Sequence, residues 1–208
     1  MGLQGRRVLV TGASGFIGRL LCRELTGRGV SYCALCDGNF FRDQTVAVIG
    51  GGNSALEESL YLAKIVRKLY LIHRRDDFRG AKCYQDKCQI HPKIEILRSS
   101  VVRRILGESK VEGVAVENLK SGETRVLDDV SGVFVFVGFQ PLAGYVPDAL
   151  AKDSQGFIIT DNEMRTNIPG VFAAGDVRSK LCRQVATAIG DGATAANAAF
   201  HYLETHDA

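Results

Sequence analysis

The sequence has no long apolar segment and no strong excess of either charge, and each absence excludes a class of protein. Its longest apolar runs, such as Val133–Val137, are far shorter than the roughly 20 residues of a membrane-spanning helix. A formal net charge of +3 over 208 residues gives no electrostatic reason to expect a nucleic-acid or membrane partner. Because a strand pattern follows Met1–Gly5 at once, we expect no signal peptide and a cytoplasmic, globular protein.

The chain has six cysteines, but it lacks the second C-x-x-C or the histidine pair of a typical zinc site. Only Cys33 and Cys36 have a spacing with a strong mechanism, since a C-x-x-C in the cytoplasm is more often catalytic or metal-binding than structural. Cys83 and Cys88 would point about 140° apart on a helix. With His91 they could bind a metal, but we expect two ordinary half-buried thiols there.

The first residues predict a strand, a glycine turn and a helix. Arg6–Val10 is the expected strand, and the turn that follows has the spacing G-x-x-G-x-x-G, formed by Gly12, Gly15 and Gly18. Such glycines let backbone N–H groups approach a pyrophosphate at a helix N-terminus, so the three are candidate cofactor-binding residues. The segment V-T-G-A-S-G-F-I-G resembles the opening of short-chain dehydrogenases and nucleotide-sugar epimerases. Their Y-x-x-x-K catalytic pair is absent, which argues against epimerase or dehydratase chemistry.

A second and more complete nucleotide-binding pattern begins at Val46. The strand Val46–Ile49 leads into a G-x-G-x-x-A turn, a helix with Leu56, Leu60 and Leu62, and a strand at Leu69–Ile72. This order is that of a βαβ unit of the right length for a dinucleotide site. The candidate nucleotide-binding residues of the turn are Gly50, Gly52, Asn53, Ser54 and Ala55.

The acid that usually binds the ribose of NAD is missing after this second strand. In its place stand His73, Arg74 and Arg75, followed by Arg79. Arginine binds a phosphate through two parallel hydrogen bonds, so these residues predict a site for the 2′-phosphate of NADPH. The alternative is a basic strand end that is merely solvated.

The remaining patterns predict an α/β fold with a Rossmann-like, three-layer parallel sheet and a small antiparallel ribbon inserted into it. An alanine-rich helix is expected from about Gln184 to Leu203, after a small-residue strand at Val171–Ala174. We divide the chain into an N-terminal βα unit (1–29), an NADPH-binding domain with the C-x-x-C (30–145) and a C-terminal segment (146–208). The further expected strands are Lys93–Leu97, Val101–Ile105, Val111–Val116, Thr124–Leu127 and Val133–Val137.

Five motifs together resemble the low-molecular-weight, bacterial type of thioredoxin reductase. They are G-V-S-Y-C-A-L-C-D-G (29–38), G-G-G-N-S-A (50–55), H-R-R-D-D-F-R (73–79), T-N-I-P-G-V-F-A-A-G-D-V (166–177) and R-Q-V-A-T-A-I-G-D-G-A (183–193). The resemblance implies an oxidoreductase that passes electrons from NADPH to FAD, then to a Cys33–Cys36 disulfide, and then to a thioredoxin-like protein disulfide. It also implies a homodimer.

The resemblance assigns roles to individual residues. Cys36 would face the flavin and Asp37 would act as general acid/base. Two segments would contact FAD. The first is Gly175 and Asp176, and the second consists of Arg183, Gln184, Val185 and Ala186.

The chain departs from this family pattern at its start. The first part of the FAD domain is replaced by the epimerase-like βα piece, which predicts an incomplete second nucleotide-binding domain. The alternative function is therefore a truncated or chimeric NADP-binding remnant that does not hold FAD.

Overall fold

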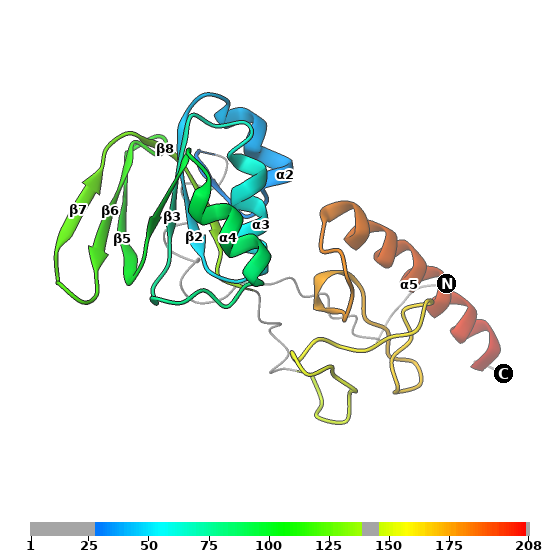
Figure 1. The fold of residues 1–208 in the computed structure, drawn as a ribbon. Helices are drawn as coiled ribbons and strands as arrows, with labels where there is room; N and C mark the ends of the chain where they lie inside the picture. Colours follow the sequence, from blue (N-terminus) through cyan, green and yellow to red (C-terminus); the bar gives the residue numbers. More distant parts are fainter. Residues whose placement is uncertain (1–27, 139–145, 207–208) are drawn as a thin grey trace. The chain divides into compact units, whose positions relative to one another are not determined.

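The computed structural model describes residues 28–138 and 146–206 (Figure 1). These two stretches belong to two compact units of the chain, and each is described by itself. The predicted strand Arg6–Val10 and the candidates Gly12, Gly15 and Gly18 lie outside the described residues. Among the described helices, none is long and apolar enough to cross a membrane.

A five-stranded parallel sheet forms the centre of the first unit. Its strands are β1 (Val30–Ser31), β2 (Thr45–Gly50), β3 (Lys68–Ile72), β4 (Ile94–Leu97) and β8 (Val130–Phe136). The order in the sheet is β1-β8-β2-β3-β4. From β2 the chain adds β3 and β4 on one side, and it then returns to add β8 on the other side of β2, so the strand order reverses between β2 and β8. The expected Rossmann-like sheet is confirmed, although Val137 lies beyond the end of β8 and is exposed.

Side chains alternate between the two faces of this sheet, and both faces are covered. On β2, Val46 and Val48 belong to the core on one face, while Ala47 and Ile49 pack on the other. The helices α2 (Ala34–Asp37), α3 (Asn53–Leu62) and α4 (Lys82–Ile90) contribute to the first core. Burial on both faces explains why these strands read as continuous apolar runs in the sequence.

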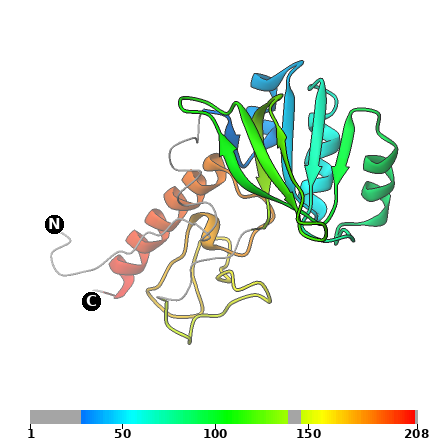
Figure 2. The same ribbon diagram turned by 90° about the vertical axis from the view of Figure 1, so that its left-hand side faces the viewer.

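The second face is covered by a separate three-stranded antiparallel sheet rather than by helices (Figure 2). Its strands are β5 (Ser100–Leu106), β6 (Gly113–Asn118) and β7 (Thr124–Leu127). The predicted ribbon is thus inserted between β4 and β8 in the chain, but it forms a layer of its own. The first unit therefore has three layers: helices, parallel sheet and antiparallel sheet (Figure 1).

The second unit, residues 146–206, contains one long helix, α5 (Val185–His206), and a single 3₁₀ turn, η2 (Gly175–Val177), among its described residues. The predicted helix from Gln184 to Leu203 is confirmed. Leu150, Ile158 and Ala173 form a small buried cluster in this unit, and Phe157, Met164 and Ala198 are also buried.

The predicted strand Val171–Ala174 was wrong. Phe172 forms only an isolated bridge with Arg165, and no ladder continues from it within the described chain. The backbone N–H groups of Thr166 and Ala173 instead donate to Val171 and Met164, which closes an irregular loop through Gly170 at φ +74°. The apolar sequence predicted burial correctly for Ala173 but did not specify a pairing partner.

We expect Phe134→Ala to lower the free energy of unfolding of the first unit by about 3–5 kcal/mol, because it leaves a cavity in a packed core. Phe134 is fully buried on β8, and its ring meets the edge of Phe41 at a centroid distance of 5.4 Å. The matched control is Phe40→Ala, since Phe40 is 77% exposed. Urea unfolding followed by circular dichroism measures both, and equal losses for the two variants would contradict the assigned core.

Candidate functional site

The two cysteines of the C-x-x-C motif form a disulfide directly after β1. Cys33 is the N-cap of α2, and its Sγ accepts a hydrogen bond from the backbone N–H of Cys36 at 3.1 Å. Cys33 is half-buried, whereas Cys36 is exposed. A thiol at the start of a helix lies where N–H groups and the helix dipole favour negative charge, which is the setting of a reactive cysteine.

Asp37 is held beside this disulfide by a residue that the sequence analysis did not single out. Ser31, buried at the end of β1, donates from Oγ to Asp37 Oδ2 at 2.6 Å. The same Oγ accepts from the backbone N–H of Cys33 at 3.1 Å. Ser31 therefore links the candidate acid/base residue to the disulfide turn. A polar residue at the end of a buried strand, two positions before Cys33, was the available signal.

The glycine turn after β2 has no room for larger residues at two of its positions. A Cβ on Gly50, which has φ +155°, would lie 2.4 Å from the carbonyl oxygen of Phe136. A Cβ on Gly51 would lie 2.3 Å from the ring of His73. A Cβ on Gly52 would meet nothing within 4 Å, so the start of α3 opens on free space. This shape suits a phosphate that approaches the N-terminus of α3.

The other candidates of the turn differ in what their side chains do. Asn53 is exposed, yet its Oδ1 accepts a hydrogen bond from the backbone N–H of Ala81 at 2.7 Å. Ser54 is exposed at the helix start, and Ala55 is buried against the core. The side chain of Asn53 therefore ties the turn to the loop before α4.

His73 is buried beneath the glycine turn, in contrast to the three arginines that follow it. Its ring stacks on Phe78 at 5.1 Å, and its Nε2 lies 3.1 Å from the carbonyl oxygen of Asp77. Burial, reinforced by the charges of Arg75 and Arg74, lowers the pKa of His73 below its usual value. A neutral His73 therefore supports the loop by packing.

The guanidinium groups of Arg74, Arg75 and Arg79 are exposed. Their side chains form no hydrogen bond or ion pair within residues 28–138 and 146–206. Of the two acids in this loop, Asp76 is engaged elsewhere, because its carboxylate accepts from Ser99 and pairs with Lys120, and the exposed Asp77 forms no ion pair with these arginines within the described residues. Three uncompensated cations thus remain at the end of β3, as a site for an anion requires.

The candidates of the first unit meet at one edge of the parallel sheet. The disulfide follows the carboxyl end of β1, the glycine turn follows β2, and the arginine loop follows β3. The carbonyl oxygen of Gly51 accepts from the N–H groups of Arg79 and Gly80, which joins the glycine turn to the arginine loop. Ligands of open α/β sheets bind at this edge, where the strand order reverses.

The candidates of the second unit surround the start of α5. The N–H of Gly175, at φ +79°, donates to Asp191 Oδ2 at 3.0 Å. Asp191 also pairs with Arg178 at 2.8 Å and with Lys180 at 3.0 Å, which fixes the loop before the helix. Asp176 is exposed within that loop.

Arg183 and the first residues of α5 have different roles. The Arg183 guanidinium lies 3.8 Å above the ring of Phe157 and donates to the carbonyl oxygen of Arg178. These contacts make Arg183 part of the loop's own structure. Gln184, Val185 and Ala186 are exposed at the N-terminus of α5, where the helix dipole favours a negative charge.

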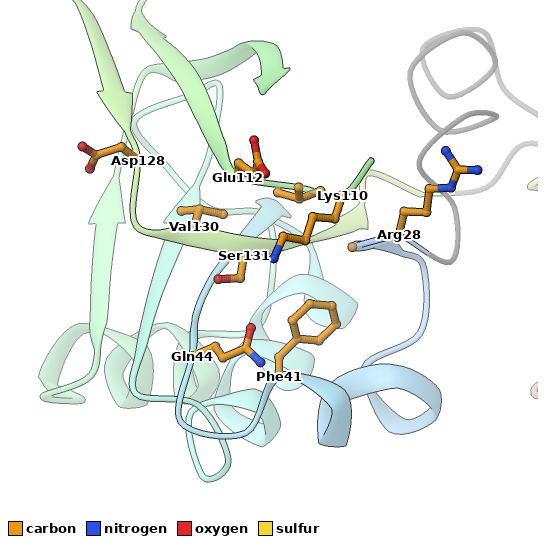
Figure 3. A pocket seen from close by; sticks show the side chains of 10 residues that line it. Arg28, Phe41, Gln44, Lys110, Glu112, Asp128, Val130 and Ser131 are labelled. Carbon is orange, nitrogen blue, oxygen red and sulfur yellow. The ribbon is translucent and has the colours of Figure 1, made fainter. Parts of the chain in front are cut away.

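A pocket of about 520 Å³ opens at the opposite edge of the parallel sheet from the glycine turn (Figure 3). It is lined at the beginnings of β1, β2 and β8 by residues such as Gly29, Gln44 and Val130. Lys110 and Glu112 place both signs of charge on its wall. Its position excludes it as the nucleotide site of this fold.

The remaining described cysteines of the first unit lie on α4. Cys88 is buried in the core, and burial raises the pKa of its thiol to about 11, which makes it unreactive. Cys83 is exposed. The expected pair of half-buried thiols is thus one buried and one exposed. No group of three His, Cys, Asp or Glu side chains is arranged to hold a metal ion in the described parts of the chain.

The chain matches the family model for pyridine nucleotide-disulphide oxidoreductases over residues 3–192. It is 47% identical to a thioredoxin reductase of Peptoclostridium acidaminophilum over 189 residues, which are 88% of this chain and 60% of that protein. It is 49% identical to a thioredoxin reductase of Treponema pallidum, again over 88% of this chain and 59% of the relative. The chain therefore spans about 60% of the length of these curated relatives.

The chain is also similar to solved structures of thioredoxin reductases. The thioredoxin reductase of Streptococcus pyogenes is 50% identical, with a TM-score of 0.78 over 86% of this chain and 58% of that one. The enzyme of Giardia duodenalis is 39% identical, with a TM-score of 0.74 over 85% of this chain and 58% of that one. The chain belongs to the pyridine nucleotide-disulphide oxidoreductase family, and its similarity is to the thioredoxin reductases.

Proposed function

We propose that this protein is an NADPH-dependent thioredoxin-disulfide reductase, in which electrons pass from NADPH to FAD, to the Cys33–Cys36 disulfide and then to a protein disulfide. One observation carries the proposal: the disulfide and a dinucleotide-type glycine turn occupy the same edge of one sheet. The similarity to thioredoxin reductases supports the choice of substrate. A cytoplasmic location and a homodimer stay predictions.

The nucleotide would bind across the ends of β2 and β3. Gly50, Gly52 and the start of α3, with Asn53, Ser54 and Ala55, would receive the pyrophosphate through backbone N–H groups. The 2′-phosphate would be bound by Arg74, Arg75 and Arg79, whose side chains are free to turn toward it. His73 would hold the glycine turn and the arginine loop in register from beneath.

The residues of the second unit fit one side of a flavin. The N-terminus of α5 offers a positive dipole, while exposed Leu181 and Val185 and small Ala186 leave an apolar, uncrowded surface there. Gly175, Asp176, Gln184, Val185 and Ala186 are the residues that would hold FAD. When bound, FAD supplies hydride acceptance from NADPH and two-electron delivery to a disulfide.

Two electrons and two protons convert the Cys33–Cys36 disulfide to two thiols. The α2 N-terminus would favour a thiolate on this pair, and Asp37, positioned by Ser31, would hold or release the proton. The thiolate would then attack the disulfide of the partner protein, forming a mixed disulfide that the second thiol resolves. The products are the reoxidised Cys33–Cys36 pair and a reduced partner.

The activity test is NADPH-driven reduction of a thioredoxin and of a small aromatic disulfide, with and without added FAD. We expect two thiols to be released for each NADPH consumed when FAD is present, because one hydride reduces one disulfide. Cys36→Ser should abolish both reactions, because no intramolecular disulfide can form, while NADPH binding remains. Absence of turnover by the wild-type chain with saturating FAD would contradict the proposed function.

Cofactor choice is tested with the double variant Arg74→Gln/Arg75→Gln. Charge-assisted hydrogen bonds contribute about 1.5–3 kcal/mol each, so the loss of two should lower NADPH affinity by at least about 100-fold. NADH affinity should change less than about threefold, since NADH has no 2′-phosphate. The control is Arg104→Gln, an exposed arginine on β5. Titration of cofactor fluorescence measures the affinities of the wild type, the double variant and the control for both cofactors, and equal losses of NADPH and NADH affinity in the double variant would refute the assignment.

A further inference from the structure

The hydroxyl group of Ser31 lies within hydrogen-bond distance of three groups beside the redox disulfide. Its Oγ is 2.6 Å from Asp37 Oδ2 and 3.2 Å from the carbonyl oxygen of Cys33. It also accepts from the backbone N–H of Cys33 at 3.1 Å. A serine hydroxyl has one proton to donate and two lone pairs that accept. The Asp37 carboxylate and the Cys33 carbonyl therefore compete for a single proton.

An ionised Asp37 draws that proton to itself. A distance of 2.6 Å is typical of an O–H group that donates to a carboxylate, whereas 3.2 Å is long for a hydroxyl donor. In this state Oγ donates to Asp37 and accepts from the N–H of Cys33, so one of its lone pairs is unused. The carbonyl oxygen of Cys33 still has a partner, because the backbone N–H of Asp37 donates to it at 3.1 Å.

A proton on Asp37 Oδ2 reverses the direction of this bond. The carboxylic O–H then donates to the unused lone pair of Ser31 Oγ, and the serine proton turns to the carbonyl oxygen of Cys33. Oγ now accepts twice and donates once, which is its full capacity. The same four groups are thus hydrogen-bonded in both protonation states of Asp37 without any displacement of their heavy atoms. Since Ser31 is only 3% exposed, little water reaches its hydroxyl group to take over these bonds.

The charged residues around Asp37 leave both states open. Asp37 forms no ion pair in the described parts of the chain. The helix α3 packs against α2 and carries Glu57 and Glu58, and Arg42 follows the 3₁₀ turn η1 (Gly38–Phe41). A paired cation would hold a carboxylate in its ionised form. A hydroxyl group that both donates and accepts does not impose one state in this way.

We propose that Ser31 is a positioning residue whose hydroxyl proton turns between the Asp37 carboxylate and the Cys33 carbonyl as Asp37 loses and gains a proton. The inference rests on the proposed function in taking Asp37 as the group that holds or releases the proton of the redox pair. It adds that the carboxyl group keeps one position through both halves of thiol–disulfide exchange. A group that is already in place has no reorganisation to complete during the reaction.

The test follows a single oxidation of the reduced chain by dithiobis(nitrobenzoate), a small aromatic disulfide. The Cys33 and Cys36 thiols give two electrons to it: its S–S bond breaks into two aromatic thiolates, and the protein S–S bond forms. The two cysteine protons pass through Asp37 to water. Absorbance of the aromatic thiolate gives the rate from about pH 5 to about pH 9, a range that spans the titration of a thiol.

The other thiols must not contribute to the signal. Cys83 and Cys182 are exposed, so every chain in the test carries Cys83→Ser and Cys182→Ser together with Cys22→Ser. Cys88 stays, because burial raises the pKa of its thiol to about 11. This full-length triple variant is the parent with which the Ser31 variants are compared.

We expect Ser31→Ala to slow the reaction about 10-fold near pH 7, the cost of a lost hydrogen bond to a charged group. The loss should shrink to less than about twofold near pH 9, because thiolates then form without Asp37. Ser31→Thr keeps the hydroxyl group and should stay within about threefold of the parent at both pH values. A merely structural role would slow the reaction equally at every pH.

The effect of Ser31 should also depend on Asp37. Asp37→Asn cannot exchange a proton, so the double variant Ser31→Ala/Asp37→Asn should be no slower than Asp37→Asn alone. The matched control is Ser100→Ala, the same change at a similarly buried serine on β5, whose Oγ donates to the carbonyl oxygen of Arg98 at 2.7 Å. Its rate should stay within about twofold of the parent.

If Ser31→Ala does not fold, Ser31→Val replaces it, because valine has the shape of threonine without the hydroxyl group. Its rate is then compared with that of Ser31→Thr. An unchanged rate without the hydroxyl group would overturn the inference, as would a loss that is equal at every pH or a full further loss in the double variant.

The measurement uses neither NADPH nor FAD, which separates this inference from the proposed function. A pH-dependent loss in a chain without NADPH-driven turnover would uphold the role of Ser31 while the proposed function fails. Normal turnover together with an unchanged exchange rate in Ser31→Ala would overturn the role of Ser31 alone.

Discussion

The pairing of β8 with both β1 and β2 is the constraint on which the first unit depends. β1 ends in the disulfide turn and β2 ends in the glycine turn, but the two strands do not touch, since β8 lies between them. β8 is formed by residues far along the chain, after the whole antiparallel sheet. The redox pair and the nucleotide turn therefore keep their spacing only while this long-range pairing is intact. A chain that ended before Val130 would contain both motifs without their geometry.

The arginine loop illustrates how neighbouring contacts prepare a site for a ligand. Asp76 could neutralise Arg74 or Arg75, but its carboxylate is engaged by Ser99 and Lys120 from the strands and turns beyond β4. Arg98 lies over the face of Phe78, whose other neighbour is the ring of His73. These contacts engage Asp76, one of the two acids beside the arginines, and stiffen the loop. The cost of ordering the loop is met in the folded protein rather than on binding.

The sequence predicted the parallel strands β2, β3, β4 and β8, the glycine turn and the long helix α5 because each has a strong local signal, either period or glycine spacing. It did not predict β1, whose two residues are too few to show a period. It could not predict that the antiparallel strands cover a sheet face, since alternation shows only that one side of a strand is buried. Val171–Ala174 was misjudged for the same reason: apolar composition indicates burial and says nothing about a partner. The contact of Ser31 with Asp37 and the burial of His73 depend on contacts between elements, which one sequence does not reveal.

The contact between Gly51 and the His73 ring has a consequence for redesign of the coenzyme preference. Because the ring fills the space beneath the glycine turn, the first residue after β3 acts as a spacer as well as a member of the basic motif. Grafting an acid at position 73, by analogy with NAD-specific folds, would bury a carboxylate and leave a void under the turn. A change of coenzyme is better sought at 74, 75 and 79, with the imidazole left in place.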